Sequence, residues 1–209
     1  MYKKTSTIIN ALKSYRENES DPVSNAILVG KTDSLTCKHM HELFPGITND
    51  EEKILTDSYK RNFPEELIDL LKLTNGAWLF ARNIIIGGLE YDPFKYKNCK
   101  LPIGIRYIDC KRSRKTPKEW LYFAEYAARE LPDVLVCVDC SISGYKKPVY
   151  ATLNGSKDII KSWDSIDDWF SSEFARFEQM YDEGRYDIVD IAGGQVRNLY
   201  FEIDLNDDV

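Results

Sequence analysis

The sequence contains little of the chemistry on which most enzymes depend. Only two of its 209 residues are histidines, and His39 and His41 lie two positions apart, which leaves little for a dispersed catalytic triad. No P-loop, GxSxG, HExxH or GxGxxG motif occurs in the sequence. Paired acids such as Asp167-Asp168 and Asp207-Asp208 are typical of solvated helix faces and tails. We therefore expect a protein that is not an enzyme, needs no cofactor and acts through its surface.

Cysteine is scarce and irregularly spaced, which predicts reduced thiols rather than a disulfide framework. The five cysteines are Cys37, Cys99, Cys110, Cys137 and Cys140. Cys37, His39 and His41 alternate along one segment and carry zinc-binding atoms, but nothing nearby completes a tetrahedral set. We therefore predict no metal site, with a zinc-dependent hydrolase as the alternative. The CxxC of Cys137 and Cys140 falls in a predicted strand, where residues three apart face opposite sides, and is interpreted as buried thiols.

Long hydrophobic runs are also absent. No segment approaches the ~20 apolar residues that are needed to span a bilayer, and no sufficiently long apolar segment for a signal peptide follows the N-terminal lysines. These absences predict a cytoplasmic protein with no membrane partner. With 43% hydrophobic residues, the chain can bury a sizeable core, so we expect one domain at residues 1–182. Residues 183–209 are interpreted as an acidic C-terminal extension, either an edge strand or a partly ordered tail.

The charges are segregated along the chain. Residues 164–209 contain 13 acidic residues and 3 basic ones, whereas residues 95–118 contain nine basic residues and a single acid, Asp109. Segregation of this kind affects the choice of partner and the rate of association rather than the fold. Each run is also compatible with an ordinary solvated surface.

The secondary structure follows from capping residues and from the period of the apolar residues. Helices are predicted after Thr7, after the capping box Thr48-Asn-Asp-Glu51, from Thr116 to Leu131, and after Ser165, the last with an aromatic stripe that includes Tyr181 and is interpreted as core. Strands are predicted at residues 83–90, 101–108, 134–140, 148–153 and 159–163.

One segment, residues 63–78, contains a complete helix with both of its boundaries. Pro64 and two glutamates suit the first turn, Leu67 and Leu71 lie on one apolar stripe, and Asn75-Gly76 tolerates the left-handed conformation that ends many helices. The motif is therefore interpreted as structural.

This Pro-acidic-acidic-Leu-x-x-Leu-Leu-x-x-x-Asn-Gly run resembles the signature of the SUKH superfamily, the Smi/Knr-type proteins, and the likeness extends over residues 48–182. The resemblance implies an α+β fold, with a single mixed, largely antiparallel sheet and helices packed against it. Bacterial members are mostly immunity proteins that neutralise a toxin, often a nuclease, of a polymorphic toxin system. A fungal branch acts as interaction scaffolds. The segment of residues 91–132 is longer than the family pattern leads us to expect.

The resemblance and the acidic C-terminal region together lead to a hypothesis about function. We predict an immunity protein that binds a cognate toxin and occludes its surface, because an inhibitor of a nuclease gains from concentrated negative charge. The predicted partner-binding residues are Asp164, Asp167, Asp168, Asp182 and Glu183, with Tyr186 and Tyr200 as anchors. The alternatives are an intracellular scaffold and a nucleic-acid-binding module that uses the basic residues 95–118.

Overall fold

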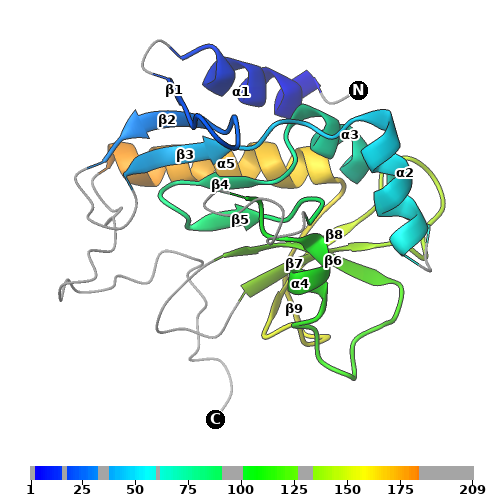
Figure 1. The fold of residues 1–209 in the computed structure, drawn as a ribbon. Coiled ribbons are helices and arrows are strands. Elements are labelled where there is room, and N and C mark those ends of the chain that lie inside the picture. The colour runs from blue at the N-terminus through cyan, green and yellow to red at the C-terminus, as the bar shows by residue number, and fades with distance from the viewer. Residues whose placement is uncertain are drawn as a thin grey trace.

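The computed structural model describes residues 3–15, 18–32, 38–59, 62–90, 101–126 and 134–183. Within these ranges the chain forms five helices and nine strands (Figure 1). In chain order they are α1 (Lys3–Lys13), β1 (Glu19–Ser20), β2 (Ile27–Lys31), β3 (His39–Leu43), α2 (Asn49–Ser58), α3 (Glu65–Leu73), β4 (Ala77–Leu79), β5 (Ile84–Ile86), α4 (Ile105–Asp109), β6 (Trp120–Tyr126), β7 (Val134–Asp139), β8 (Val149–Leu153), β9 (Ile159–Trp163) and α5 (Ile166–Asp182).

The strands form one open sheet whose spatial order is the order of the sequence, from β1 to β9. Every pair of neighbouring strands is antiparallel, and the one parallel pairing in the described residues is an isolated bridge between Gly88 and Gly104. Figure 1 shows the sheet twisting, so that β2 and β3 run in a different direction from β6 and β7. The predicted α+β class with a single, largely antiparallel sheet is confirmed.

Helices cover both faces of this sheet unequally. The larger core joins one face to side chains from α1, α2, α3 and α5, and its largest members include Leu67, Leu70, Trp169 and Phe177. The aromatic residues of α5 lie on those of the sheet, with the ring centroids of Trp169 and Phe123 5.1 Å apart. A smaller cluster on the opposite face contains Ile108 of α4, while Ile105 of the same helix belongs to the larger core.

The helix predicted from Thr116 to Leu131 is wrong, because β6 occupies Trp120–Tyr126 and residues 127–133 lie outside the described part. All seven residues of β6 are buried, so its apolar residues face both sides of the sheet and imitate helical spacing. A bulge between Tyr122 and Ala124 then changes the side to which the residues point. Thr116 does not begin a helix, since its hydroxyl donates to the carbonyl of Gly155 at 2.6 Å.

The predicted strand at residues 101–108 is also wrong, because Ile105–Asp109 forms the short helix α4. Two of its apolar residues, Ile105 and Ile108, are buried against the sheet rather than paired along an edge. The first helix begins at Lys3, upstream of the predicted cap Thr7.

Two predicted helix starts are confirmed in detail. Thr48 and Glu51 form a reciprocal capping box at α2, with the Thr48 Oγ1 accepting from the Glu51 main-chain N–H at 3.3 Å. Ser165 caps α5 without a reciprocal bond to its own N–H, by accepting from the N–H of Asp168 at 3.1 Å. Helices α2 and α5 therefore begin where their polar capping residues require.

In the described ranges we find no helix with both the length and the apolar character that crossing a membrane requires. Most of the predicted C-terminal extension, residues 184–209, lies outside the described part of the chain.

Candidate functional site

The Pro64–Gly76 motif lies in the interior and organises its surroundings. Pro64 is the N-cap of α3, and Leu67 and Leu71 are fully buried. The side chain of Asn75 forms two hydrogen bonds with the main chain of Leu89, accepting from its N–H at 2.6 Å and donating to its carbonyl at 3.4 Å. Gly76 has a φ of +81°, and a Cβ there would lie 2.7 Å from the carbonyl oxygen of Ile86. The motif therefore holds α3 against the segment that follows β5.

Glu66, within the same motif, has a role that its sequence position does not suggest. Its side chain is buried and accepts hydrogen bonds from the main-chain N–H groups of Ile166 (3.1 Å) and Asp167 (3.4 Å), the first two residues of α5. Burial raises the pKa of the Glu66 carboxyl, and these N–H groups together with that of Lys147 oppose the rise. A carboxylate at a helix N-terminus complements the helix dipole. Glu66 thus joins α3 to the start of α5.

The predicted partner-binding acids at the N-terminal end of α5 differ from one another in exposure. Asp164 is exposed, whereas Asp167 and Asp168 are half-buried. Asp167 accepts from the N–H (2.8 Å) and the hydroxyl (2.5 Å) of Thr5 in α1. Asp168 accepts from the hydroxyl of Ser165 at 2.7 Å. Asp167 and Asp168 therefore already have partners within the chain.

The other predicted acids, Asp182 and Glu183, lie at the far end of α5 and are exposed. Asp182 lies fifteen positions after Asp167 along the helix, which corresponds to a rise of about 22 Å. The predicted set is therefore divided between two places on the surface. The predicted anchors Tyr186 and Tyr200 lie outside the described residues.

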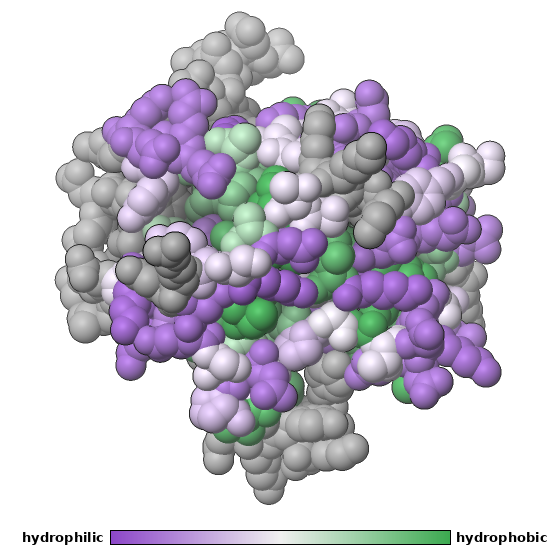
Figure 2. Space-filling model, turned by 90° about the horizontal axis from the view of Figure 1, so that it is seen from above, coloured by the Kyte–Doolittle hydropathy of each residue, from purple (hydrophilic) through white to green (hydrophobic). Residues whose placement is uncertain are grey.

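A groove of about 560 Å³ opens beside the C-terminal end of α5, where α1 packs against that helix. It is lined by residues of α1, β2, β3 and α5 together with Phe80, and the lining includes Ile8, Ala11, Leu12, Tyr15, Val29, Gly30, Lys31, Met40, His41, Phe174, Glu178, Tyr181 and Asp182. Two aromatic residues of the rim are exposed, since Tyr15 is 54% exposed and Tyr181 is 48% exposed. The view from above α1 shows hydrophobic patches in the gaps between hydrophilic side chains (Figure 2).

The floor of the groove is neutral. His41 is 7% exposed and stacks with Phe174 at a centroid distance of 5.6 Å. Its Nδ1 accepts from the main-chain N–H of Phe80 at 3.4 Å. Burial lowers the pKa of His41 to about 4, so the ring is uncharged at neutral pH.

The rim of the groove is negative. Partial burial, and then the nearby charge of Asp182, raise the pKa of Glu178. Lys31, which also lines the groove, forms an ion pair with Glu19 at 2.8 Å. A partner that brings a cation to this rim would therefore relieve the repulsion between the two carboxylates.

Most of these groove residues were missed at the level of the sequence. Tyr181 was predicted to be part of the core stripe of α5, and this is wrong, since the exposed last turn of the helix carries it to the rim. The sequence contained one indication that Tyr181 is exposed, because the polar pair Asp182-Glu183 directly follows it. Nothing local indicated that α1 would lie alongside.

The described part of the basic segment lies on the opposite face, around α4. Arg106, Arg114, Lys115 and Lys118 are exposed, whereas Lys111 forms an ion pair with Glu125 at 2.5 Å. Residues 95–100 lie outside the described part. The acidic groove and the basic segment are therefore on different sides of the sheet.

The described cysteines and histidines do not lie together in one site. Cys137 is buried in the cluster under α4, where burial raises the pKa of its thiol far above the ordinary range, and Cys140 follows the end of β7. His39 lies 3.6 Å from a carboxylate oxygen of Glu19, and Cys37 is outside the described residues. Across the ranges that the structure describes, no cluster of three or more His, Cys, Asp or Glu side chains could hold a metal ion.

Comparisons with known proteins agree with the fold. Residues 46–172 match the model of the SMI1 / KNR4 family (SUKH-1). Searches of curated proteins and of solved structures gave no significant match. The matched residues include the Pro64–Gly76 motif with Glu66 and the first seven residues of α5, and they make up more than half of the chain. The chain therefore belongs to the SMI1/KNR4 (SUKH-1) family.

Proposed function

We propose that this protein is an immunity protein, which binds a cognate toxin through the groove between α1 and α5 and neutralises it by covering its surface. The observation that carries the proposal is the combination of Tyr15 and Tyr181 around an apolar floor with Glu178 and Asp182 on the rim. Family membership supports a protein partner. Neutralisation of this kind requires no catalysis by the bound protein.

The composition of the groove suits the centre of a protein interface. Exposed tyrosines provide a large contact area at a small entropic cost, and they are enriched among residues that dominate binding energy. A volume of about 560 Å³ accommodates one or two side chains, while a stable interface buries ~1,600 Å² in total. The groove would thus hold an anchor residue, and the surrounding surface would supply the remaining contact area.

The negative charge of the rim indicates which side chains of a partner would be favoured. Glu178 and Asp182 repel each other, so an aliphatic or aromatic anchor flanked by lysine or arginine would be favoured. A nuclease has a basic surface for its polyanionic substrate, and this makes a nuclease toxin a suitable partner. Glu183 extends the same charge beyond the end of α5.

The proposal can be tested with the product of a neighbouring reading frame that is toxic when expressed alone. Co-expression of this protein should restore growth, and the purified proteins should bind each other. The double variant Tyr181→Ala/Asp182→Lys should raise the Kd about 100-fold, as expected when a central aromatic anchor and a rim charge are lost. Asp164→Lys is the matched control, because it reverses an exposed charge at the opposite end of α5.

Each outcome separates the alternatives. An equal loss of affinity in Asp164→Lys would move the interface to the N-terminal end of α5. Tight binding without restored growth would favour the scaffold function over neutralisation. Binding that depends on Arg114 and Lys115 but not on Tyr181 would place the partner on the basic face.

A further inference from the structure

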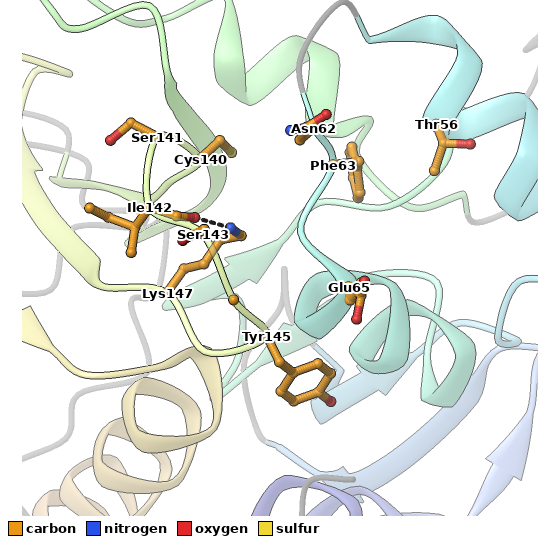
Figure 3. A pocket seen from close by; sticks show the side chains of 11 residues that line it. Thr56, Asn62, Phe63, Glu65, Cys140, Ser141, Ile142, Ser143, Tyr145 and Lys147 are labelled. Atoms are coloured by element: carbon orange, nitrogen blue, oxygen red, sulfur yellow. Dashed lines mark hydrogen bonds between the residues drawn. The ribbon is translucent and has the colours of Figure 1, made fainter.

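A second, polar pocket shares no lining residue with the groove, and the proposed function does not use it. It has a volume of about 650 Å³ and opens between the loop that joins β7 to β8 and residues near the C-terminal end of α2 and the N-terminal end of α3 (Figure 3). The loop contributes Cys140, Ser141, Ile142, Ser143, Gly144, Tyr145 and Lys147, and the facing side contributes Thr56, Asn62, Phe63 and Glu65.

Lys147 gives this pocket a buried positive charge. The residue is 7% exposed, yet it lines the pocket, and its Nζ donates to the main-chain carbonyl of Ile142 (Figure 3). Among the residues that the structure describes, no carboxylate forms an ion pair with this ammonium group. Because no described carboxylate neutralises this ammonium group, an anionic group of a ligand in the pocket would gain a charge-assisted hydrogen bond from it.

The pocket is formed in advance of any ligand. The hydroxyl of Tyr145 donates to Asp69 of α3 at 2.5 Å, which holds the loop against the helix. At the start of the loop, the N–H of Cys140 donates to the carbonyl of Glu119 at 3.0 Å. The N–H of Lys147 contributes to the stabilisation of the Glu66 carboxylate. Because these contacts fix the walls, a ligand would not have to order the loop.

The opposite wall carries the opposite charge. Glu65, at the start of α3, is exposed and faces the pocket across from the loop (Figure 3). Asp69 follows one turn later on the same helix. A phosphate dianion would be attracted by Lys147 but repelled by these carboxylates. A simple amine would be attracted by the carboxylates but repelled by Lys147. The arrangement complements a molecule that carries both charges.

We propose that this pocket binds a small zwitterion of the α-amino-acid type, with its carboxylate on Lys147 and its ammonium group toward Glu65. The hydroxyl of Ser143 and the amide of Asn62 provide further hydrogen-bonding groups, whereas the hydroxyl of Ser141 already donates to Asp139 at 2.6 Å. The ring of Phe63 provides an apolar wall for a side chain. The site is independent of the groove between α1 and α5.

The experiment is a titration of the full-length protein, followed by NMR and by calorimetry, with each of the twenty standard amino acids. At least one should shift resonances of the loop at residues 140–147. Its analogue without the amino group and its analogue without the carboxylate should each bind at least ~10-fold more weakly, the loss expected for one charge-assisted hydrogen bond. Tighter binding of inorganic phosphate, or equal binding of the carboxylate analogue, would overturn the assignment.

Two variants locate the site, and a third is a control. Lys147→Met keeps the main-chain N–H and most of the side-chain volume, and it should raise the Kd for the amino acid at least ~10-fold. Ser143→Trp, at an exposed loop position, fills the pocket without touching the core and should abolish binding even if Lys147→Met fails to fold. Lys157→Met removes an exposed lysine from the turn between β8 and β9 and should bind normally. No binding by the wild type, or undiminished binding by Ser143→Trp, would refute the proposal.

Discussion

The two ends of α5 carry similar acids and use them differently. At the N-terminal end, Asp167 accepts two hydrogen bonds from Thr5, and the free N–H groups of the helix are taken by Glu66. At the C-terminal end, Asp182 stands with Tyr181 on the rim of an open groove. The first end is occupied by contacts that maintain the fold, whereas the second leaves the side chains of Tyr181 and Asp182 exposed at the surface.

This difference shows why a run of acidic residues does not by itself define an interface. Negative charge in the first turn of a helix is favourable for the helix, because it complements the exposed N–H groups. Negative charge in the last turn is unfavourable for the helix, so its presence there needs another explanation. Asp182 lies in this last turn and Glu178 lies one turn before it, and under the function that we propose a cationic partner would compensate both charges.

The largest effect should come from removing the carboxylate that holds the N-terminal end. Glu66→Ala leaves buried N–H groups of α5 without acceptors and should reduce the free energy of unfolding by about 3–4 kcal/mol. Denaturation with urea at pH 7 measures this change. The neighbouring Glu65→Ala is the matched control, and a loss below about 1 kcal/mol is expected there because Glu65 is exposed. Equal losses in the two variants would contradict the role that we assign to Glu66.

The second effect concerns pH and the floor of the groove. Because burial holds the pKa of His41 at about 4, below the ordinary value of 6.5, its contribution to stability is complete above pH 6.5 and is lost as the pH falls through 4. The difference of roughly 2.5 pKa units corresponds to about 3 kcal/mol.

The measurement is the free energy of unfolding of the wild type and of His41→Leu between pH 7 and pH 4. Stability of the wild type should fall by about 3 kcal/mol more than that of the variant over this range. Carboxylates elsewhere titrate in both proteins, so the difference isolates His41. Parallel pH profiles would show that the imidazole is not held neutral.

The smallest effect compares single acids at the two ends directly. Asp167→Ala removes the two hydrogen bonds with α1 and should cost about 1–2 kcal/mol of stability. Asp182→Ala should change the stability by less than about 0.5 kcal/mol, because the residue is exposed. Thermal unfolding of both variants under one set of conditions tests the pair. If Asp182→Ala proved the more destabilising substitution, our distinction between a structural end and a binding end would fail.

Prediction from sequence succeeded where one local pattern had one physical meaning. The caps Thr48 and Ser165 specify helix starts because each side chain accepts from the N–H group three residues later. The failure at Trp120–Tyr126 has the opposite origin. An apolar run that is buried on both sides satisfies a helix and a central strand equally well, and only pairing with β5 and β7 decides between them.

The sequence by itself determined the helix boundaries at Thr48 and Ser165, the α+β class and, through the Pro64–Gly76 motif, the resemblance to the family, since these depend on residues near one another in the chain. Only the tertiary structure decided which acids are engaged within the fold and which face outward. It also created the groove by placing α1 beside α5, and the polar pocket by placing the loop with Lys147 against α3. Both sites combine residues that are far apart in the chain, and their relative positions follow from the packing of the whole sheet rather than from any local preference.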